Sequence, residues 1–441
     1  MSSSETTLGA TDQGLKRGLP ARFALAVTVG GIIGLGILRG PGEIAAVIRD
    51  PYFYLMLWLL GGLFVLLSTA VVVELVGMTP RSGGTYALIR HAYGPFSGFV
   101  IGWVDWLSFV ADIALKAVVI VEFVGILLPV PTPWQTTLAI MVTSMFAAIQ
   151  LRGIALGAAI QQFATAVIGL IVVGFSLLLV FAGPVAVAEL DAAPVVNAGL
   201  GAWSLVVATI IFTYDGWLYP AYFSGEVKGG AGAVARSCIK GIGIVIALYL
   251  LLNSAMLTSV PLSALAGKEL ALSQALELAV SPVAANAVVF AALFILLSNQ
   301  NLLYMGAPRI IHALATDGLA TKHAQAVGRG GNPVFAVLVT WIVSVGLILL
   351  GGFKFLVLLC VFFFVILYLV LIVGVIILRR REPDSPRPHR AWGHPYSTAV
   401  CLVGWTIITG FQAVAERETA IYALAMVAVA WPVYRLLTRK T

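Results

Sequence analysis

About twelve segments of this chain are each apolar over roughly the 20 residues that an α-helix needs to cross a bilayer. Charged residues make up only 10% of the chain, against roughly 25% in an ordinary soluble domain. The pattern predicts an all-α polytopic membrane protein. The apolar segments lie near residues 23–47, 52–78, 97–128, 134–149, 154–182, 203–223, 237–259, 283–305, 333–351, 353–378, 396–413 and 419–437.

The basic residues lie mainly on one side of the predicted membrane. If the amino terminus is placed in the cytoplasm, about 20 of the 26 lysines and arginines fall in cytoplasmic segments, where such residues are enriched. The densest cluster, Arg379–Arg390, separates the tenth and eleventh segments. We therefore expect both termini in the cytoplasm and a polar cytoplasmic tail over residues 1–20. This topology accounts for the net charge of +7, so membrane lipid is the expected partner and nucleic acid is not.

Two of the apolar segments contain residues that weaken a helix. The first includes TVGGIIGLGILRGPGEIAA, Thr28–Ala46, with six glycines and a proline, and the sixth includes ATIIFTYDGWLYPAYFSGEV, Ala208–Val227. Five crossings separate the two, so the second copy runs in the opposite direction. Irregular segments at matching positions of two halves point to a transporter site. The alternative explanation is close helix packing through small residues four apart, such as Gly30 and Gly34.

The same symmetry predicts the domain organisation. We expect two inverted five-helix repeats over residues 21–182 and 203–378, a basic cytoplasmic loop over residues 379–395, and two further helices over residues 396–437. The first and sixth helices would be discontinuous at mid-membrane, where exposed N–H and C=O groups need a partner. Such groups suit a ligand that carries a carboxylate and an ammonium.

Several motifs, in this order, resemble those of the amino acid–polyamine–organocation transporter superfamily, in particular its L-amino-acid-transporter-like bacterial permeases. They are GGIIGLGILRGPGEIAA, ELVGMTPRSGGTYALIRHAYGPFSGFVIGW, IFTYDGWLYPAYFSGEVK and APRIIHALATDGL. The resemblance implies the inverted-repeat fold of that superfamily, the type also found in LeuT, and transport of amino acids.

The resemblance also implies which residues bind the substrate. The substrate carboxylate would be bound by the backbone N–H groups of Gly34–Gly36, and its ammonium by the carbonyl groups of Ile32, Phe212 and Asp215. The ring of Phe212 matches a gate over the substrate, and Asp215 is expected to contribute mainly its carbonyl. The candidate substrate-binding residues are Ile32, Ile33, Gly34, Leu35, Gly36, Phe212, Thr213, Tyr214, Asp215 and Gly216.

The third segment carries ionisable residues at membrane depth. Asp105, Asp112 and Lys116 lie within about 20° of one helical stripe. One interpretation is a structural ion pair between Asp112 and Lys116, which are four residues apart, with Asp105 in water near the cytoplasmic edge. The alternative makes Asp105 or Asp112 a proton acceptor that couples transport to a proton gradient.

These features favour a secondary active transporter, a permease or exchanger, that moves neutral amino acids by alternating access. Cationic amino acids or polyamines, and proton-coupled symport, are the alternatives. A channel is a remote alternative, because a single pair of broken helices fits an occluded site better than a continuous pore. A membrane-embedded enzyme is another, because the sequence contains no catalytic cluster at useful spacing. The ATP-binding pattern GxxxxGK[ST] is also absent from it. We expect no catalytic residue, no metal site and no cofactor.

Overall fold

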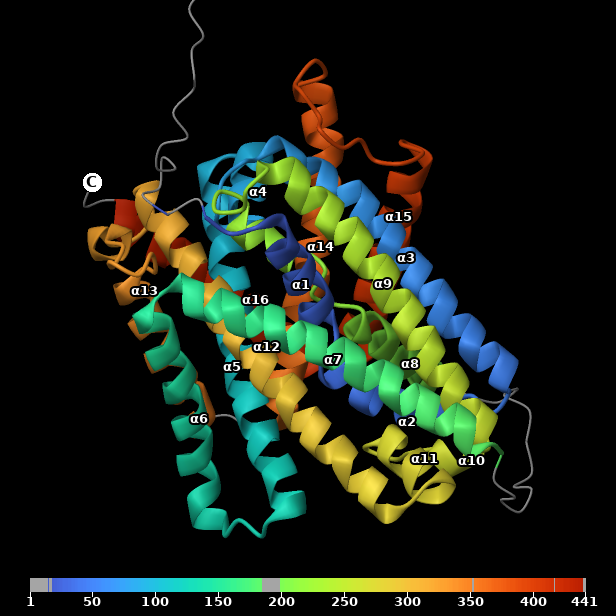
Figure 1. The fold of residues 1–441 in the computed structure, drawn as a ribbon. Coiled ribbons are helices and arrows are strands. Elements are labelled where there is room, and N and C mark those ends of the chain that lie inside the picture. The colour runs from blue at the N-terminus through green and yellow to red at the C-terminus, as the bar shows by residue number, and fades with distance from the viewer. Residues whose placement is uncertain (1–14, 16–17, 185–198, 351–352, 416, 439–441) are drawn as a thin grey trace, which may run out of the picture.

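The computed structural model describes residues 15, 18–184, 199–350, 353–415 and 417–438 (Figure 1). Within these residues the secondary structure is helical, apart from one isolated bridge between Leu19 and Val227. The predicted all-α fold class is therefore confirmed. Most of the polar tail expected over residues 1–20 lies outside the described residues.

The first predicted segment is divided into two helices. α1 (Ala21–Ile32) ends at the centre of the segment, and α2 (Leu35–Val47) begins after two non-helical residues, so this helix is discontinuous. The other helices of the first half are α3 (Pro51–Met78), α4 (Gly84–Tyr93), α5 (Pro95–Leu127), α6 (Thr132–Arg152) and α7 (Ile154–Ala182).

The sixth predicted segment is divided in a similar way. α8 (Leu200–Thr213) ends in a turn, and the 3-10 helix η1 (Tyr219–Phe223) follows. The remaining helices are α9 (Gly230–Ser259), α10 (Leu262–Leu265), α11 (Ala271–Ala279), α12 (Pro282–Thr316), η2 (Lys322–Gln325), α13 (Val334–Leu350), α14 (Phe353–Arg381), α15 (Tyr396–Ala415) and α16 (Arg417–Thr438).

Eight helices of the described chain are long and apolar enough to cross a membrane, if α1 and α2 count as one. The other seven are α3, α6, α7, α9, α12, α14 and α15. α5 has sufficient length, 33 residues, but carries four ionisable side chains. α8 and α13 are apolar but shorter. The chain is therefore an integral, multi-pass membrane protein.

Local sequence signals set where the long helices begin. Asp50 precedes α3, and its carboxylate accepts a hydrogen bond of 2.6 Å from the N–H of Phe53. Ser281 precedes α12, and its hydroxyl accepts one of 3.2 Å from the N–H of Ala284. A proline follows each capping residue, where its missing N–H costs no helical hydrogen bond.

The two ends of the helix bundle differ. Figure 1 shows α4 at one end of the molecule and α10 and α11 at the opposite end, and we call these the α4 end and the α11 end. The loop between α14 and α15 also lies at the α4 end. In the interior, α1 packs against α7 and α9, α5 packs against α12 and α14, and α2 packs against α8. The two discontinuous helices therefore lie side by side in the core.

Candidate functional site

The first helix break leaves backbone N–H donors without a helical partner at the start of α2. Ile33 is extended, and Gly34 has φ −147° and ψ −149° before α2 begins at Leu35. The first N–H groups of a helix have no partner within the helix, and no side chain caps α2. This helix start, with its partial positive charge, is therefore suited to an anionic group such as a carboxylate.

The carbonyl groups at the first break are largely bonded within the protein. The Asn299 side-chain amide donates to the carbonyl oxygens of Gly30 and Ile33, each at 3.1 Å. The Tyr249 hydroxyl lies within hydrogen-bond distance of the Ile32 oxygen, at 3.0 Å, and of the Thr213 oxygen, at 3.1 Å. Asn299 and Tyr249 thus stabilise the non-helical backbone that hydrocarbon would otherwise disfavour.

The second break contacts the first directly. Gly216 has φ +101°, and a Cβ added there would lie 2.7 Å from the carbonyl oxygen of Gly31. A Cβ added at Gly36 would lie 2.5 Å from Cα of Thr213. Glycine is therefore required at both positions for close backbone approach, and for the positive φ at Gly216.

A pocket lies where the two breaks meet. Five of the ten predicted binding residues line it, namely Ile32, Gly34, Gly36, Phe212 and Asp215. The side chains of Asn299, Tyr219 and Phe364 contribute polar and aromatic surface from α12, η1 and α14. The complete lining is Gly31, Ile32, Gly34, Gly36, Asp112, Lys116, Phe212, Asp215, Tyr219, Asn299 and Phe364.

The other predicted residues lie around this pocket. Tyr214 packs against Trp58, and its hydroxyl donates to the Trp58 carbonyl oxygen at 3.0 Å. The Thr213 hydroxyl donates to the Thr209 carbonyl oxygen, and Ile33 is fully buried beside Asn299. Gly216 borders a neighbouring cavity instead. Leu35 contributes its backbone as the first residue of α2.

The pocket carries more charge than the sequence indicates. Lys116 and Asp112 form an ion pair of 2.5 Å, and both line the pocket. The Asp215 carboxylate also lines it and accepts a hydrogen bond from the Tyr368 hydroxyl. Tyr368 in turn stacks on Trp217, with ring centroids 5.0 Å apart. The pocket therefore contains charged side chains in addition to the Asp215 carbonyl that the resemblance assigns to the substrate.

Asp105 occupies a different environment from the one expected. It is only 1% exposed, and hydroxyls of Tyr222 and Thr85 donate to its carboxylate. The expectation that Asp105 lies in water near the cytoplasmic edge is wrong, because α4 and η1 pack over this part of α5. Asp105 lines the neighbouring cavity rather than the pocket that contains Asp112 and Lys116.

Ion pairs connect the structural elements at the α4 end. The buried Arg309 guanidinium bonds both oxygens of the Glu226 carboxylate, at 2.6 and 2.8 Å. Asp317 pairs with Arg81 at 2.8 Å and with Arg90. Burial favours the neutral acid at Asp317, but hydrogen bonds from Arg81 and Tyr86 and the charges of both arginines outweigh it. The pKa of Asp317 therefore lies below its ordinary value.

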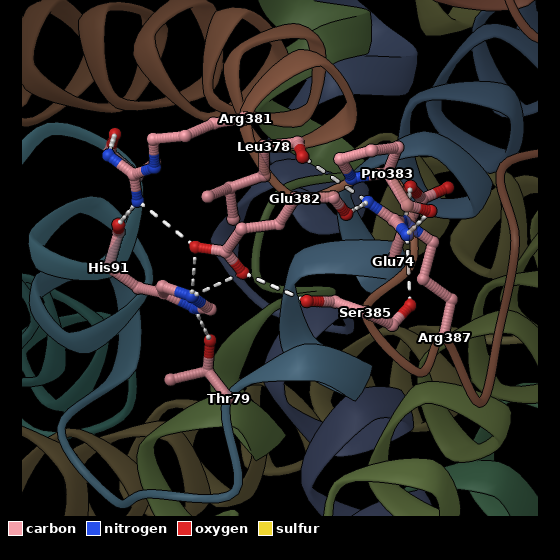
Figure 2. Close-up of polar contacts among 10 residues, drawn as sticks. Glu74, Thr79, His91, Leu378, Arg381, Glu382, Pro383, Ser385 and Arg387 are labelled. Atoms are coloured by element: carbon pink, nitrogen blue, oxygen red, sulfur yellow. Dashed lines mark hydrogen bonds and ion pairs between the residues drawn. The ribbon is translucent and has the colours of Figure 1, made fainter.

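A second network fixes the loop between α14 and α15 at the same end (Figure 2). Glu74 of α3 accepts from Arg387 at 3.0 Å, from Arg379, and from the N–H of Ala391 at 2.7 Å. Figure 2 also shows His91 between Thr79 and Glu382, with 3.1 Å between His91 Nε2 and one Glu382 oxygen. The basic cluster predicted from the sequence is therefore folded against α3 and α4.

Sequence reasoning missed several contributors to the pocket. Asn299 lies in a run of polar residues within the apolar α12, and such a run is a usable signal. Tyr249 and Tyr368 give no comparable signal, because each is an isolated aromatic residue in an apolar helix. In the described part of the chain, no group of three or more His, Cys, Asp or Glu side chains could hold a metal ion.

Residues 23–432 match the profile of the amino acid permease family. A serine/threonine exchanger of Bacillus subtilis is 29% identical over 250 residues, which are 56% of this chain and 56% of the exchanger. A gamma-aminobutyric acid permease of Bacillus subtilis is 23% identical over 339 residues, 74% of this chain and 71% of the permease. The human b(0,+)-type amino acid transporter 1 is 26% identical over 258 residues, 55% of this chain and 52% of the transporter. The match thus spans only about half the length of two of these relatives.

Proposed function

Because the chain belongs to the amino acid permease family, whose members are transporters rather than enzymes, we propose that it carries amino acids across a membrane by alternating access. The observation that carries the proposal is the pocket between the two helix breaks. It joins a helix start with free N–H groups to the partly buried side chain of Asp215 within one small volume. These are complementary to the two charged groups of an amino acid.

We propose that the substrate lies between these two groups. Its carboxylate accepts hydrogen bonds from the N–H groups at the start of α2, beside Gly34 and Gly36. Its ammonium faces the Asp215 carboxylate, and its side chain contacts the aromatic rings of Phe212 and Phe364. The direct contact between the two breaks supports this arrangement, because movement of either break changes the shape of the pocket.

Neutral amino acids are the first candidate substrates. The ion pair of Asp112 with Lys116 cancels two of the three charges in the pocket lining, and Asp215 is matched by the substrate ammonium. The serine/threonine exchanger among the relatives makes L-serine and L-threonine the first compounds to test.

Cationic amino acids or polyamines are the second candidate. The pocket lining has two carboxylates, Asp112 and Asp215, and one ammonium, Lys116, which leaves one formal negative charge. A side-chain cation could compensate this charge in addition to the α-ammonium.

The proposed orientation places the α4 end and both termini in the cytoplasm of a bacterial inner membrane, with lipid around the apolar helices. The basic loop over residues 379–395 lies at that end, as the positive-inside rule requires. The proposed repeats are residues 21–182 and 203–378, each beginning with one of the two helix breaks, and residues 396–437 add two helices. In this orientation the structure is closed toward the cytoplasm.

Reconstituted protein tests the proposal. Liposomes containing the purified full-length chain are preloaded with an unlabelled amino acid and exposed to radiolabelled L-serine, L-threonine, L-leucine, L-arginine or gamma-aminobutyric acid. We expect saturable counterflow of at least one α-amino acid. Absence of counterflow and of net uptake for the whole panel, with folded protein in the liposomes, would contradict the proposal.

A further inference from the structure

Asp105 is a buried carboxylate that has no cationic partner among the described residues. Its side chain is 1% exposed, and the Tyr222 hydroxyl lies 2.8 Å from each of its oxygens. Thr85 donates a second hydroxyl. Among the residues that the structure describes, Asp105 forms no ion pair within 4.0 Å. An ionised carboxylate buried in this way is costly, and such groups take up a proton instead.

Asp112 provides a comparison on the same helix. It lies two turns further along α5 and is also buried, but the Lys116 ammonium bonds it at 2.5 Å. Its charge is balanced within the protein, so no proton is needed there. Asp105 therefore differs from Asp112 in the lack of a counter-ion and not in burial.

Three structural elements that close the α4 end meet at Asp105. Thr85 belongs to α4, Tyr222 belongs to η1, and Asp105 belongs to α5. α4 and η1 also pack tightly, because a Cβ added at Gly84 would lie 2.0 Å from the Tyr222 ring. The hydroxyl bonds to Asp105 thus connect both elements to α5.

Asp105 also lies beside the substrate pocket, on the side of the α4 end. It lines a cavity that shares Asp215, Tyr219 and Phe364 with the substrate pocket. Like charges on one cavity oppose each other, so simultaneous ionisation of Asp105 and Asp215 is disfavoured. The polar and titratable groups around Asp105 are Thr85 of α4, Tyr219 and Tyr222 of η1, Asp215 after α8, and Tyr368 of α14.

We propose that Asp105 is the proton-binding site that couples amino acid transport to a proton gradient. This inference rests on the proposed function, and it identifies the proton as the ion that is transported together with the amino acid. In the closed form, the buried side chain is the neutral acid. When the α4 end opens, α4 and η1 move away from α5, water reaches Asp105, and the proton leaves on that side. The O–H bond of the acid forms when the carboxylate takes a proton from water on the α11 side, and it breaks when Asp105 gives that proton to water at the α4 end.

Infrared spectroscopy tests the protonation without any substrate. A buried, protonated carboxylic acid gives its own C=O stretching band. We expect this band in the wild-type protein, its loss in Asp105→Asn, and its retention in the matched control Asp384→Asn, which changes an exposed carboxylate. An identical band in wild type and Asp105→Asn would overturn the inference, and so would absence of the band from the wild type.

Tyr222→Phe gives a second test that retains the carboxylate. Removal of one hydroxyl donor makes the ionised form of Asp105 less favourable. The infrared band should therefore persist to more alkaline pH in Tyr222→Phe than in the wild type. An unchanged pH profile would contradict the placement of the proton on Asp105, and this result does not depend on whether Asp105→Asn folds.

Transport then tests the coupling. If one proton is carried with each amino acid molecule, an inward gradient of one pH unit should raise accumulation of the counterflow substrates about tenfold in the wild type. In Asp105→Asn the pH gradient should have no effect on accumulation, while counterflow of the same radiolabelled amino acids continues.

Counterflow in the wild type without any response to pH, or equal pH-driven accumulation in Asp105→Asn, would overturn the inference but leave the proposed function intact. Loss of amino acid binding in Asp105→Asn at every pH would make this carboxylate a substrate site instead. Absence of wild-type counterflow would count against the proposed function itself.

Discussion

The substrate pocket and the α4 end use carboxylates in different ways. In the pocket, the Asp215 carboxylate is bonded by the Tyr368 hydroxyl and by the Gly216 backbone, and Asp112 has a single lysine partner. At the α4 end the carboxylates of Glu226, Glu74 and Asp317 are each bonded by arginine, through at least two contacts. Planar guanidinium groups hold carboxylates in a fixed geometry, whereas single hydroxyl and ammonium partners leave bonding capacity for a ligand. The comparison indicates that the arginine-bonded carboxylates of the α4 end hold helices together, whereas the carboxylates of the pocket can bind a ligand.

The largest effect is expected at the buried pair of Arg309 and Glu226. Arg309→Met leaves the Glu226 carboxylate buried without its partner and should destabilise the protein by about 3–5 kcal/mol. Thermal unfolding of the purified protein in detergent measures the change. Arg380→Met, at an exposed arginine of the same region, is the control.

The double variant Arg309→Met/Glu226→Leu sharpens this test. It removes both charges, so its unfolding temperature should lie above that of Arg309→Met alone. If Arg309→Met unfolds at the same temperature as Arg380→Met, the pair does not stabilise the closed α4 end, and the comparison fails.

Asp215→Asn should have the next largest effect, on binding rather than on stability. It removes the negative charge that faces the substrate ammonium. Affinity for the transported amino acid should fall about tenfold to a hundredfold, since a hydrogen bond to a charged group contributes about 1.5–3 kcal/mol. Competition against the radiolabelled substrate measures it. Asp384→Asn should bind like the wild type, and wild-type affinity in Asp215→Asn would show that the ammonium binds elsewhere.

Tyr368→Phe should have a smaller effect on the same carboxylate. The ring can still stack on Trp217, but the hydroxyl that orients Asp215 is lost. This hydrogen bond exists with and without substrate, so only part of its energy, about 1 kcal/mol, should be lost from binding, and the affinity should fall about fivefold. In the variant Tyr368→Phe/Asp215→Asn the additional loss should vanish, and a fully additive loss would contradict a role through Asp215.

The pH dependence of the α4 end is expected to be the smallest effect. Because the pKa of Asp317 is held below its ordinary value, its ion pairs contribute fully above the ordinary carboxyl pKa. They are lost only as the pH falls through the lowered value. Labelling of a cysteine introduced on this side should therefore be unchanged by mild acid in the wild type. Asp317→Asn should increase labelling by less than about fivefold, because partly exposed pairs contribute about 1 kcal/mol or less. An increase in labelling of the wild type under mild acid would contradict this assignment.

The helices and their breaks could be predicted from the sequence. Long apolar runs specify spanning helices, and the glycines and proline between Thr28 and Ala46 mark where the first helix fails. The ion pair of Asp112 with Lys116 also follows from spacing, because residues four apart on a helix are neighbours.

The partners of the isolated polar residues could not be predicted in this way. Tyr222 contacts Asp105 across 117 residues of sequence, and Tyr368 contacts Asp215 across 153. Periodicity reports which face of one helix is polar, but not which helix packs against that face. The expectation that Asp105 is in water was wrong for this reason.

The central claim is that the N–H groups at the start of α2 bind the substrate carboxylate. Gly34→Ala tests it most directly, because a Cβ there would lie 3.0 Å from the end of the Asn299 side chain and inside the pocket lining. Gly36 is less suitable, since its Cβ would meet the Thr213 backbone. Gly346→Ala, a helical glycine with open space around it, is the control.

The decisive measurement is equilibrium binding of the radiolabelled amino acid that the uptake panel identifies to purified wild type, Gly34→Ala and Gly346→Ala. We expect Gly346→Ala to bind like the wild type and Gly34→Ala to lose at least about tenfold in affinity, with an unchanged unfolding temperature. Wild-type affinity in folded Gly34→Ala would contradict binding of the carboxylate at the start of α2.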